Sequence, residues 1–179
     1  MNKAVLLSIR PKWCVKIING EKTCEVRKTA PKLKPPFKCY IYASKGKDRL
    51  FDILRDGDMN FGEVYHGKTV FLTKPEEGFF EVQRRNVIGE FVCDKIMETR
   101  PDILSAQIKR GDFSGYATGM SVNDFMAYMG NRKLYLWHIT GFKKYAQAKP
   151  LQAFDGWNAV EGHHIDIPPQ SWCYVKEVS

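Results

Sequence analysis

The stretch NGEKTCEVRK, residues 19–28, decides the fold of this chain and raises the first question about its function. It carries five charged side chains of both signs, which are Glu21, Lys22, Glu25, Arg27 and Lys28. Asn19 and Gly20 indicate the end of a helix, because glycine readily adopts the left-handed conformation found there. The charges therefore lie at a chain reversal. They form either a solvated turn held by its own ion pairs or the edge of a site for a polar, anionic ligand.

The segments around this stretch predict a strand, a helix and a second strand. Residues 3–9, KAVLLSI, have the apolar character of a strand that opens the fold. Residues 10–20, RPKWCVKIING, predict a short helix with Pro11 in its first turn and an apolar stripe at helical spacing. Residues 23–28, TCEVRK, are strand-like. The charged stretch thus joins the helix to the second strand.

Most of the remaining chain predicts strands. These are expected at residues 38–44, 86–98, 133–145 and 167–178. Residues 45–66 indicate a long surface excursion, and residues 69–82 predict a hairpin with PEEG as its turn. A short helix is predicted at residues 121–130, where Ser121 and Asp124 have the spacing of a helix cap.

The order of elements predicts one domain over residues 1–179, with a surface excursion and hairpin at 45–85. Its class is α+β and mostly β: a small mixed or antiparallel β-barrel with short flanking helices. No apolar run approaches the roughly 20 residues of a membrane span, and the N-terminal run is shorter than a signal-peptide core. A cytoplasmic protein without membrane contact is therefore expected.

Metal, cofactor and disulfide chemistry have no support in the sequence. The five cysteines are scattered without a C-x-x-C pair, which is typical of reduced thiols. His163 and His164 are adjacent and do not have the spacing of metal ligands on a helix. Neither a G-x-G-x-x-G motif nor a Walker lysine is present. We expect no metal and no cofactor.

The net charge of +8 is unevenly distributed. The first 50 residues hold 13 lysines and arginines against 3 acidic residues, whereas the remaining residues hold 15 against 17. A polyanion would therefore be attracted to one region of the molecule rather than to its whole surface. The alternative is that these lysines only keep the protein soluble.

A motif and five ordered segments carry a resemblance to a known family. Gly20, Lys22, Glu25 and Arg27 form a G-x-K-x-x-E-x-R motif. The segments are LLSIRPKWCVKIINGEKTCEVRKTAPK, FKCYIYASKGK, VIGEFVCDKI, LYLWHITGFKKYAQAKPL and PPQSWCYVKEV. In both respects the chain resembles the ASCH domain family, a branch of the PUA-like β-barrels, in its bacterial and phage form. The resemblance covers most of the chain outside residues 48–85 and 99–130.

The resemblance implies RNA, or a nucleotide within it, as the ligand, bound in a cleft beside the helix-to-strand turn. One branch of the family consists of amidohydrolases acting on an acylated cytidine, whose nucleophile is a threonine three places after the lysine. Glu25 occupies that place here, so the same mechanism is not supported. If the chain is an enzyme, Lys22, Glu25 and Glu90 would carry the reaction. A phage-encoded adaptor that contacts an acidic host protein is the third alternative.

The expected ligand-binding residues are Lys12, Trp13, Lys16, Lys22, Glu25, Arg27, Lys28 and Trp172. Within this set, four cations, Lys12, Lys16, Lys22 and Arg27, would contact backbone phosphates. Glu25 would accept hydrogen bonds from a base amine or from ribose hydroxyls. The two tryptophans would stack on bases. The alternative for the motif is structural, with ion pairs from Glu25 to Lys22 or Arg27 holding the turn.

Overall fold

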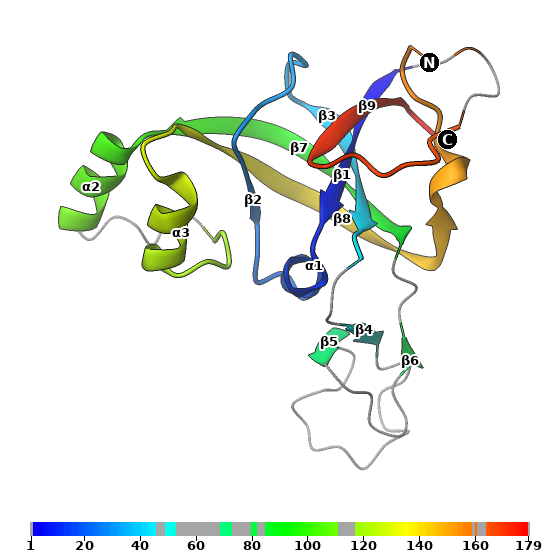
Figure 1. Cartoon of the computed structure of the whole chain (residues 1–179), viewed down its shortest axis with the longest axis horizontal. Coiled ribbons are helices and arrows are strands. Elements are labelled where there is room, and N and C mark those ends of the chain that lie inside the picture. The colour runs from blue at the N-terminus through cyan, green and yellow to red at the C-terminus, as the bar shows by residue number, and fades with distance from the viewer. Residues whose placement is uncertain are drawn as a thin grey trace.

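A six-stranded mixed sheet forms the body of the protein (Figure 1). The computed structural model describes residues 2–45, 49–52, 69–72, 80–81, 85–110, 117–158, 160 and 164–178. The strands are β1 (Lys3–Ile9), β2 (Cys24–Arg27), β3 (Phe37–Ala43), β7 (Asn86–Thr99), β8 (Leu134–Pro150) and β9 (Trp172–Lys176). They lie in the order β2-β8-β7-β3-β1-β9. Only β1 and β3 pair in parallel within this described sheet, and the other neighbours are antiparallel.

Three α-helices flank the sheet in the described chain. They are α1 (Pro11–Ile18), α2 (Pro101–Lys109) and α3 (Val122–Met129), and a single 3-10 turn, η2 (Leu151–Ala153), follows β8. At eight or nine residues, each helix is far shorter than a helical membrane span. The helices at α1 and α3 confirm the prediction, whereas α2 was not predicted. In Figure 1, α2 and α3 lie together at one end of the long ribbon formed by β7 and β8.

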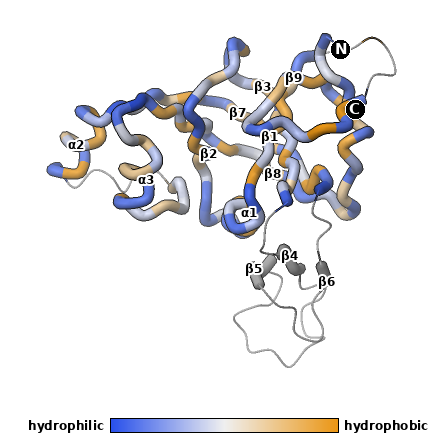
Figure 2. Tube along the Cα trace, in the orientation of Figure 1, coloured by the Kyte–Doolittle hydropathy of each residue, from blue (hydrophilic) through white to orange (hydrophobic). Residues whose placement is uncertain are grey.

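Two apolar clusters cover the two faces of the central strands. The alternation predicted for β3 places Cys39, Ile41 and Ala43 in the interior cluster with Trp137. Tyr40 and Tyr42 point to the other face and are buried in a second cluster against Phe154 and Leu151. Figure 2 shows β1 in the hydrophobic colours where it crosses the middle of the molecule. Burial on both faces fits the continuous apolar run of β1.

Side chains close the barrel between its two edge strands. In the described residues, no backbone hydrogen bond joins β2 to β9. Instead, Arg27 of β2 donates to the carbonyl oxygens of Ser8 and Ser171 at 2.9 and 3.1 Å. Beyond β2, the Trp172 Nε1–H donates to Thr29 Oγ1 at 3.0 Å. Side-chain hydrogen bonds, and not a backbone ladder, therefore connect the two edges of the predicted barrel. The contact between these edges is called the barrel seam.

The strands of the excursion pair differently from the prediction. A separate sheet contains β4 (Arg49–Asp52), β5 (Thr69–Leu72) and β6 (Phe80–Glu81), with β4 in the centre. The predicted hairpin at 69–82 is wrong in its pairing, since β5 and β6 each pair with β4 and not with each other. Its PEEG turn lies outside the described residues.

The cap predicted for α3 forms as expected. Ser121 Oγ accepts a hydrogen bond from the backbone N–H of Asp124 at 3.1 Å. Replacing Ser121 with alanine is expected to lower the free energy of unfolding by about 1 kcal/mol, because one N–H at the helix start loses its partner. Urea unfolding measures this change. Retention of a side-chain acceptor in Ser121→Asp should keep most of the stability, and a cost as large as that of alanine would contradict the cap.

Candidate functional site

The reversal after α1 is held by the segment that precedes α3. The helix ends at Ile18, and Gly20 has a φ of +75°, as its place at the helix end predicts. The backbone N–H of Thr23 and that of Cys24 both donate to the carbonyl oxygen of Ala117, at 2.8 and 3.1 Å. The start of β2 is therefore anchored to a segment nearly 100 residues away. This anchoring directs the side chains of the G-x-K-x-x-E-x-R motif into the barrel.

Three charged residues of the motif form a buried ionic cluster of Lys22, Glu25 and Arg27. Their exposed fractions are 3, 5 and 8%. Glu25 lies between the two cations, with Lys22 Nζ 3.3 Å from Oε2 and Arg27 Nε 2.9 Å from Oε1. The structural alternative for the motif is thus realised, because Glu25 pairs with both cations. Removal of Glu25 would leave two buried cations without a counter-charge.

The two cations of the ionic cluster are also committed to other oxygens of the chain. Lys22 Nζ donates to the carbonyl oxygens of Cys24 and Thr118 at 2.8 and 2.7 Å, in addition to its ion pair with Glu25. Burial lowers the pKa of Lys22, and the neighbouring Glu25 carboxylate opposes this effect. Arg27 holds the barrel seam. Neither cation is therefore free to bind a phosphate.

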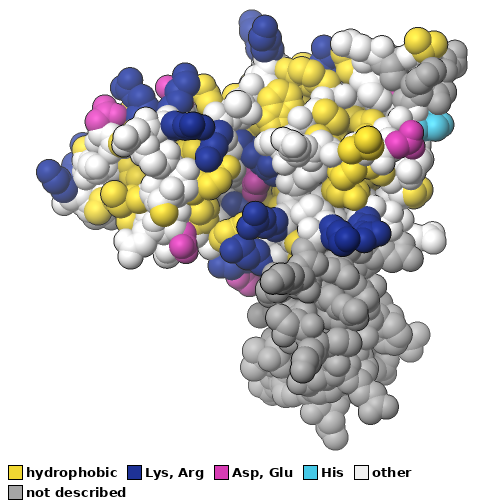
Figure 3. All heavy atoms as spheres, viewed as in Figure 1, with side chains coloured by type: hydrophobic (Ala, Val, Ile, Leu, Met, Phe, Trp, Pro, Cys, Tyr) yellow, Lys and Arg dark blue, Asp and Glu magenta, His cyan; other side chains and the backbone are white. Residues whose placement is uncertain are grey.

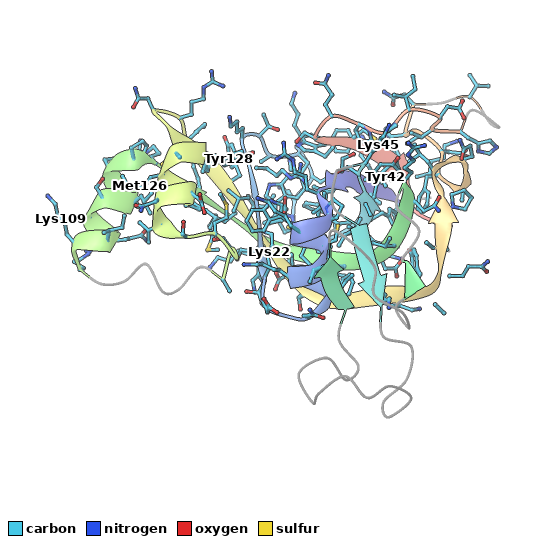
Figure 4. The ribbon with its side chains drawn as sticks, turned by 60° about the horizontal axis from the view of Figure 1, so that its bottom comes forward. Lys22, Tyr42, Lys45, Lys109, Met126 and Tyr128 are labelled. Carbon is cyan, nitrogen blue, oxygen red and sulfur yellow. The ribbon has the colours of Figure 1, made fainter. Side chains whose placement is uncertain are left out.

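The ionic cluster lies at a cavity of about 910 Å³. Its walls come from the start of α1, the strand β2, the end of β3, α3, and residues 168–170. Figure 3 shows lysine and arginine side chains gathered around a recess between the helical end of the molecule and the sheet, with an acidic side chain visible inside. In Figure 4, Lys22 lies between Tyr128 on one side and Tyr42 with Lys45 on the other. The volume is at the upper end of the range for small-molecule sites.

Four exposed cations line the mouth of this cavity and are called the rim cations: Arg10, Lys12, Lys45 and Arg85. None of them forms an ion pair with a carboxylate of the described chain. The sheet brings them together, since Ile9 lies opposite Ala43 in the parallel register. Arg85 joins them because its backbone N–H donates to the carbonyl oxygen of Ala43 at 2.8 Å. These are the cations available to a polyanion.

Three aromatic side chains also line the cavity: Trp13, Tyr42 and Tyr128. Burial raises the pKa of the Tyr128 hydroxyl, Arg27 and Arg10 oppose the rise, and Glu25 adds to it. This pattern places the hydroxyl near the ionic cluster, although the ring of Tyr128 is 38% exposed. The Trp13 ring lies 4.6 Å from Lys12 Nζ and 5.5 Å from Lys22 Nζ, so cations already occupy its surroundings.

The structure brings five of the eight expected binding residues to the cavity: Lys12, Trp13, Lys22, Glu25 and Arg27. The other three lie elsewhere. Lys16 donates to the carbonyl oxygen of Gly119 at 2.8 Å, and Lys28 lies over the ring of Tyr128. Trp172 packs in the barrel seam between Trp137 and Tyr174. Arg10, Tyr42, Lys45, Arg85 and Tyr128 line the cavity without having been selected as site residues.

The residues proposed for an enzymatic reaction do not converge. Glu90 of β7 accepts a hydrogen bond from Tyr145 at 2.6 Å, lies 3.7 Å from Lys38, and does not line the cavity. Lys22 and Glu25 are bound to each other. Within the described part of the chain, no three His, Cys, Asp or Glu side chains are grouped to hold a metal ion. The three residues proposed for catalysis therefore do not form one site.

The architecture is similar to that of solved ASCH structures. The crystal structure of ASCH from Zymomonas mobilis superimposes with a TM-score of 0.56 at 15% sequence identity, covering 97% of this chain and 88% of that one. Two mutant structures of the Zymomonas mobilis protein give TM-scores of 0.57 at 15 and 14% identity, covering 98 and 97% of this chain and 92 and 89% of theirs. The chain has the ASCH fold. No family model and no curated protein matches the sequence.

The match extends over nearly the whole chain, so the ASCH fold expected from the sequence is confirmed. At such low identity the likeness concerns the fold alone. The fold does not identify a ligand. The cavity, the rim cations and the ionic cluster of this chain are therefore the basis for its proposed function.

Proposed function

We propose that this chain is an ASCH-domain protein that binds single-stranded RNA and holds one nucleotide in the cavity beside the ionic cluster. The observation that carries the proposal is the contrast between the two sets of cations. The two cations of the ionic cluster are engaged by Glu25 and by oxygens of the chain, whereas the four rim cations have no carboxylate partners in the described chain. Unpaired cations around a cavity attract a phosphate backbone and leave the interior for the base.

The interior of the cavity offers the groups that a base requires. Tyr128 presents an aromatic ring with a hydroxyl group, and base stacking on such a ring contributes roughly 1–3 kcal/mol per base. Tyr42 also lines the cavity, although most of its side chain is buried in the second apolar cluster. The start of α1 lies at the same cavity, and the partial positive charge of a helix N-terminus favours an anion there. A single strand suits this arrangement, because its bases are free to leave the stack and enter a pocket.

The salt dependence of binding tests the proposal. With four rim contacts, log affinity should fall against log salt with a slope of roughly −2.8, or about 50-fold between 50 and 200 mM salt. Fluorescence anisotropy with a labelled mixed-sequence RNA decamer measures both quantities. A matched DNA decamer shows whether the sugar contributes.

A variant of the rim cations and a control variant test whether the salt dependence of RNA binding arises at the cavity. Replacing all four rim cations with glutamine should bring the slope close to zero and weaken binding. The control changes the same number of exposed lysines that do not line the cavity, Lys34, Lys95, Lys109 and Lys143, and should bind RNA nearly as the unchanged protein does. Equal losses in the two variants, or no RNA binding at 50 mM salt, would refute the proposal.

A further inference from the structure

We infer that the cavity selects bases that carry an exocyclic amine, with the carboxylate of Glu25 as the acceptor, and that it rejects uracil. The inference rests on the proposed function and specifies which nucleotides the cavity accepts. It follows from the hydrogen-bonding state of the ionic cluster and from the donors and acceptors on the edges of the four bases.

The carboxylate of Glu25 is attracted by two cations but receives no well-aligned hydrogen bond from either. Oε2 of Glu25 and Nε of Arg27 are both buried without a hydrogen-bond partner, even though the ion-pair distances are 3.3 and 2.9 Å. The charges are therefore close enough to attract, while the N–H groups point elsewhere. Buried polar atoms rarely remain without partners. Because Glu25 lines the cavity, an entering ligand can supply the missing donor.

The side chains around Glu25 hold its carboxylate in place, and none of them can replace it as the hydrogen-bond acceptor for the base. Lys22 donates to two carbonyl oxygens, and Arg27 spans the barrel seam. Ser8, which also lines the cavity, donates its hydroxyl to the carbonyl oxygen of Pro169 at 2.6 Å. A carboxylate accepts hydrogen bonds and donates none. The buried part of the cavity therefore presents an acceptor to the base.

The bases differ in what they offer to such an acceptor. Cytosine, adenine and guanine each carry an exocyclic amine whose N–H can donate to Glu25, whereas uracil presents the oxygen O4 where cytosine has its amine. Uracil in the same position would place an oxygen against a carboxylate and leave the buried acceptor unpaired. A hydrogen bond to a charged group is strong enough to give at least about tenfold discrimination.

The test uses the unmodified protein and RNA pentamers of the form UUXUU. Pentamers with cytosine or adenine at X should bind at least about tenfold more tightly than UUUUU. Replacing the central cytosine with 2-pyrimidinone, which lacks the amine, should remove this advantage. Equal affinity for all of these pentamers would overturn the inference and leave the proposed function standing. If no pentamer and no longer RNA binds, the proposed function itself fails.

A variant then assigns the selection to Glu25. In Glu25→Gln the amide oxygen is expected to face the two cations and the amide N–H₂ the cavity, which favours O4 of uracil. The preference for cytosine should fall below about threefold or reverse. Glu21→Gln is the matched control, since Glu21 is an exposed carboxylate of the same chain reversal that does not line the cavity, and it should keep the selection. Full discrimination in a folded Glu25→Gln protein would exclude Glu25 as the acceptor. If that variant does not fold, the 2-pyrimidinone pentamer still decides.

Discussion

Replacing Lys22 with methionine is expected to lower the free energy of unfolding by about 3–5 kcal/mol. The side chain is 3% exposed and donates to the carbonyl oxygens of Cys24 and Thr118 while it pairs with Glu25. Methionine has a similar volume, so little cavity is created, but the carbonyl oxygens of Cys24 and Thr118 lose their donor and Glu25 keeps Arg27 alone as a partner. Leaving buried acceptors unpaired costs about 1–3 kcal/mol each, and the lost ion pair adds to this. Urea unfolding followed by circular dichroism measures the change.

Two further variants separate this explanation from a loss of packing. The triple variant Lys22→Met, Glu25→Leu, Arg27→Met removes all charges of the ionic cluster and should be more stable than the single variant, because no buried charge remains. Lys28→Met removes an exposed lysine next to the motif and should change the stability by less than about 0.5 kcal/mol. A cost below about 1 kcal/mol for Lys22→Met would show that the cluster is accessible to water.

The expected instability also bears on tests for catalysis. If a Lys22 variant unfolds, its turnover is lost, and this loss could be mistaken for evidence that Lys22 is catalytic. Any activity assay with such a variant therefore requires a measurement of the folded fraction. Glu25→Gln is less disruptive in volume, but it also changes the charge balance of the ionic cluster.

Elements with a local signal were predictable from the sequence. The helix α1 has Pro11 at its start and Gly20 after its end, and α3 has its cap at Ser121. The helix α2 was missed because its apolar stripe is short, with Leu104 buried and Ile108 partly buried. A signal was nevertheless present, since Pro101 and Asp102 are typical of a first helical turn.

Pairing between distant segments was not predictable in the same way. The sequence of residues 69–82 is compatible with a hairpin, but β5 and β6 both pair with β4, which precedes them in the chain. The choice between a local and a more distant partner depends on the packing of the whole segment. Periodicity along one strand carries no information about which neighbour it takes.

The sequence indicated residues that line the cavity, but not the role of each cation. The charges at 22, 25 and 27 lie at the cavity, yet whether they face a ligand or one another depends on burial. Arg10, Lys45 and Arg85 lie far apart in the sequence. The parallel register of β1 with β3 and the hydrogen bond to the carbonyl of Ala43 bring them together.

Truncating Trp137 is the second substitution for which we expect a large effect. Trp137 is fully buried, lies opposite Glu25 in the pairing of β2 with β8, and packs edge-on against Phe37 with ring centroids 6.0 Å apart. Trp137→Ala should lower the free energy of unfolding by about 3–5 kcal/mol, because it leaves a cavity in the interior of the barrel. Urea unfolding measures this cost.

Trp137→Phe should cost much less than the alanine variant. The indole Nε1–H of Trp137 is buried without a hydrogen-bond partner in the described chain, so phenylalanine removes a donor whose burial is already unfavourable. Trp172→Phe is the comparison, since the Trp172 N–H donates to Thr29 Oγ1 and its loss breaks a bond of the barrel seam. If Trp137→Phe were as destabilising as Trp137→Ala, the N–H would have to be bonded, for instance to a buried water beside Glu25. Water would then lie beside the carboxylate of Glu25. This carboxylate, which is the proposed acceptor for the base amine, would already receive a hydrogen bond from solvent.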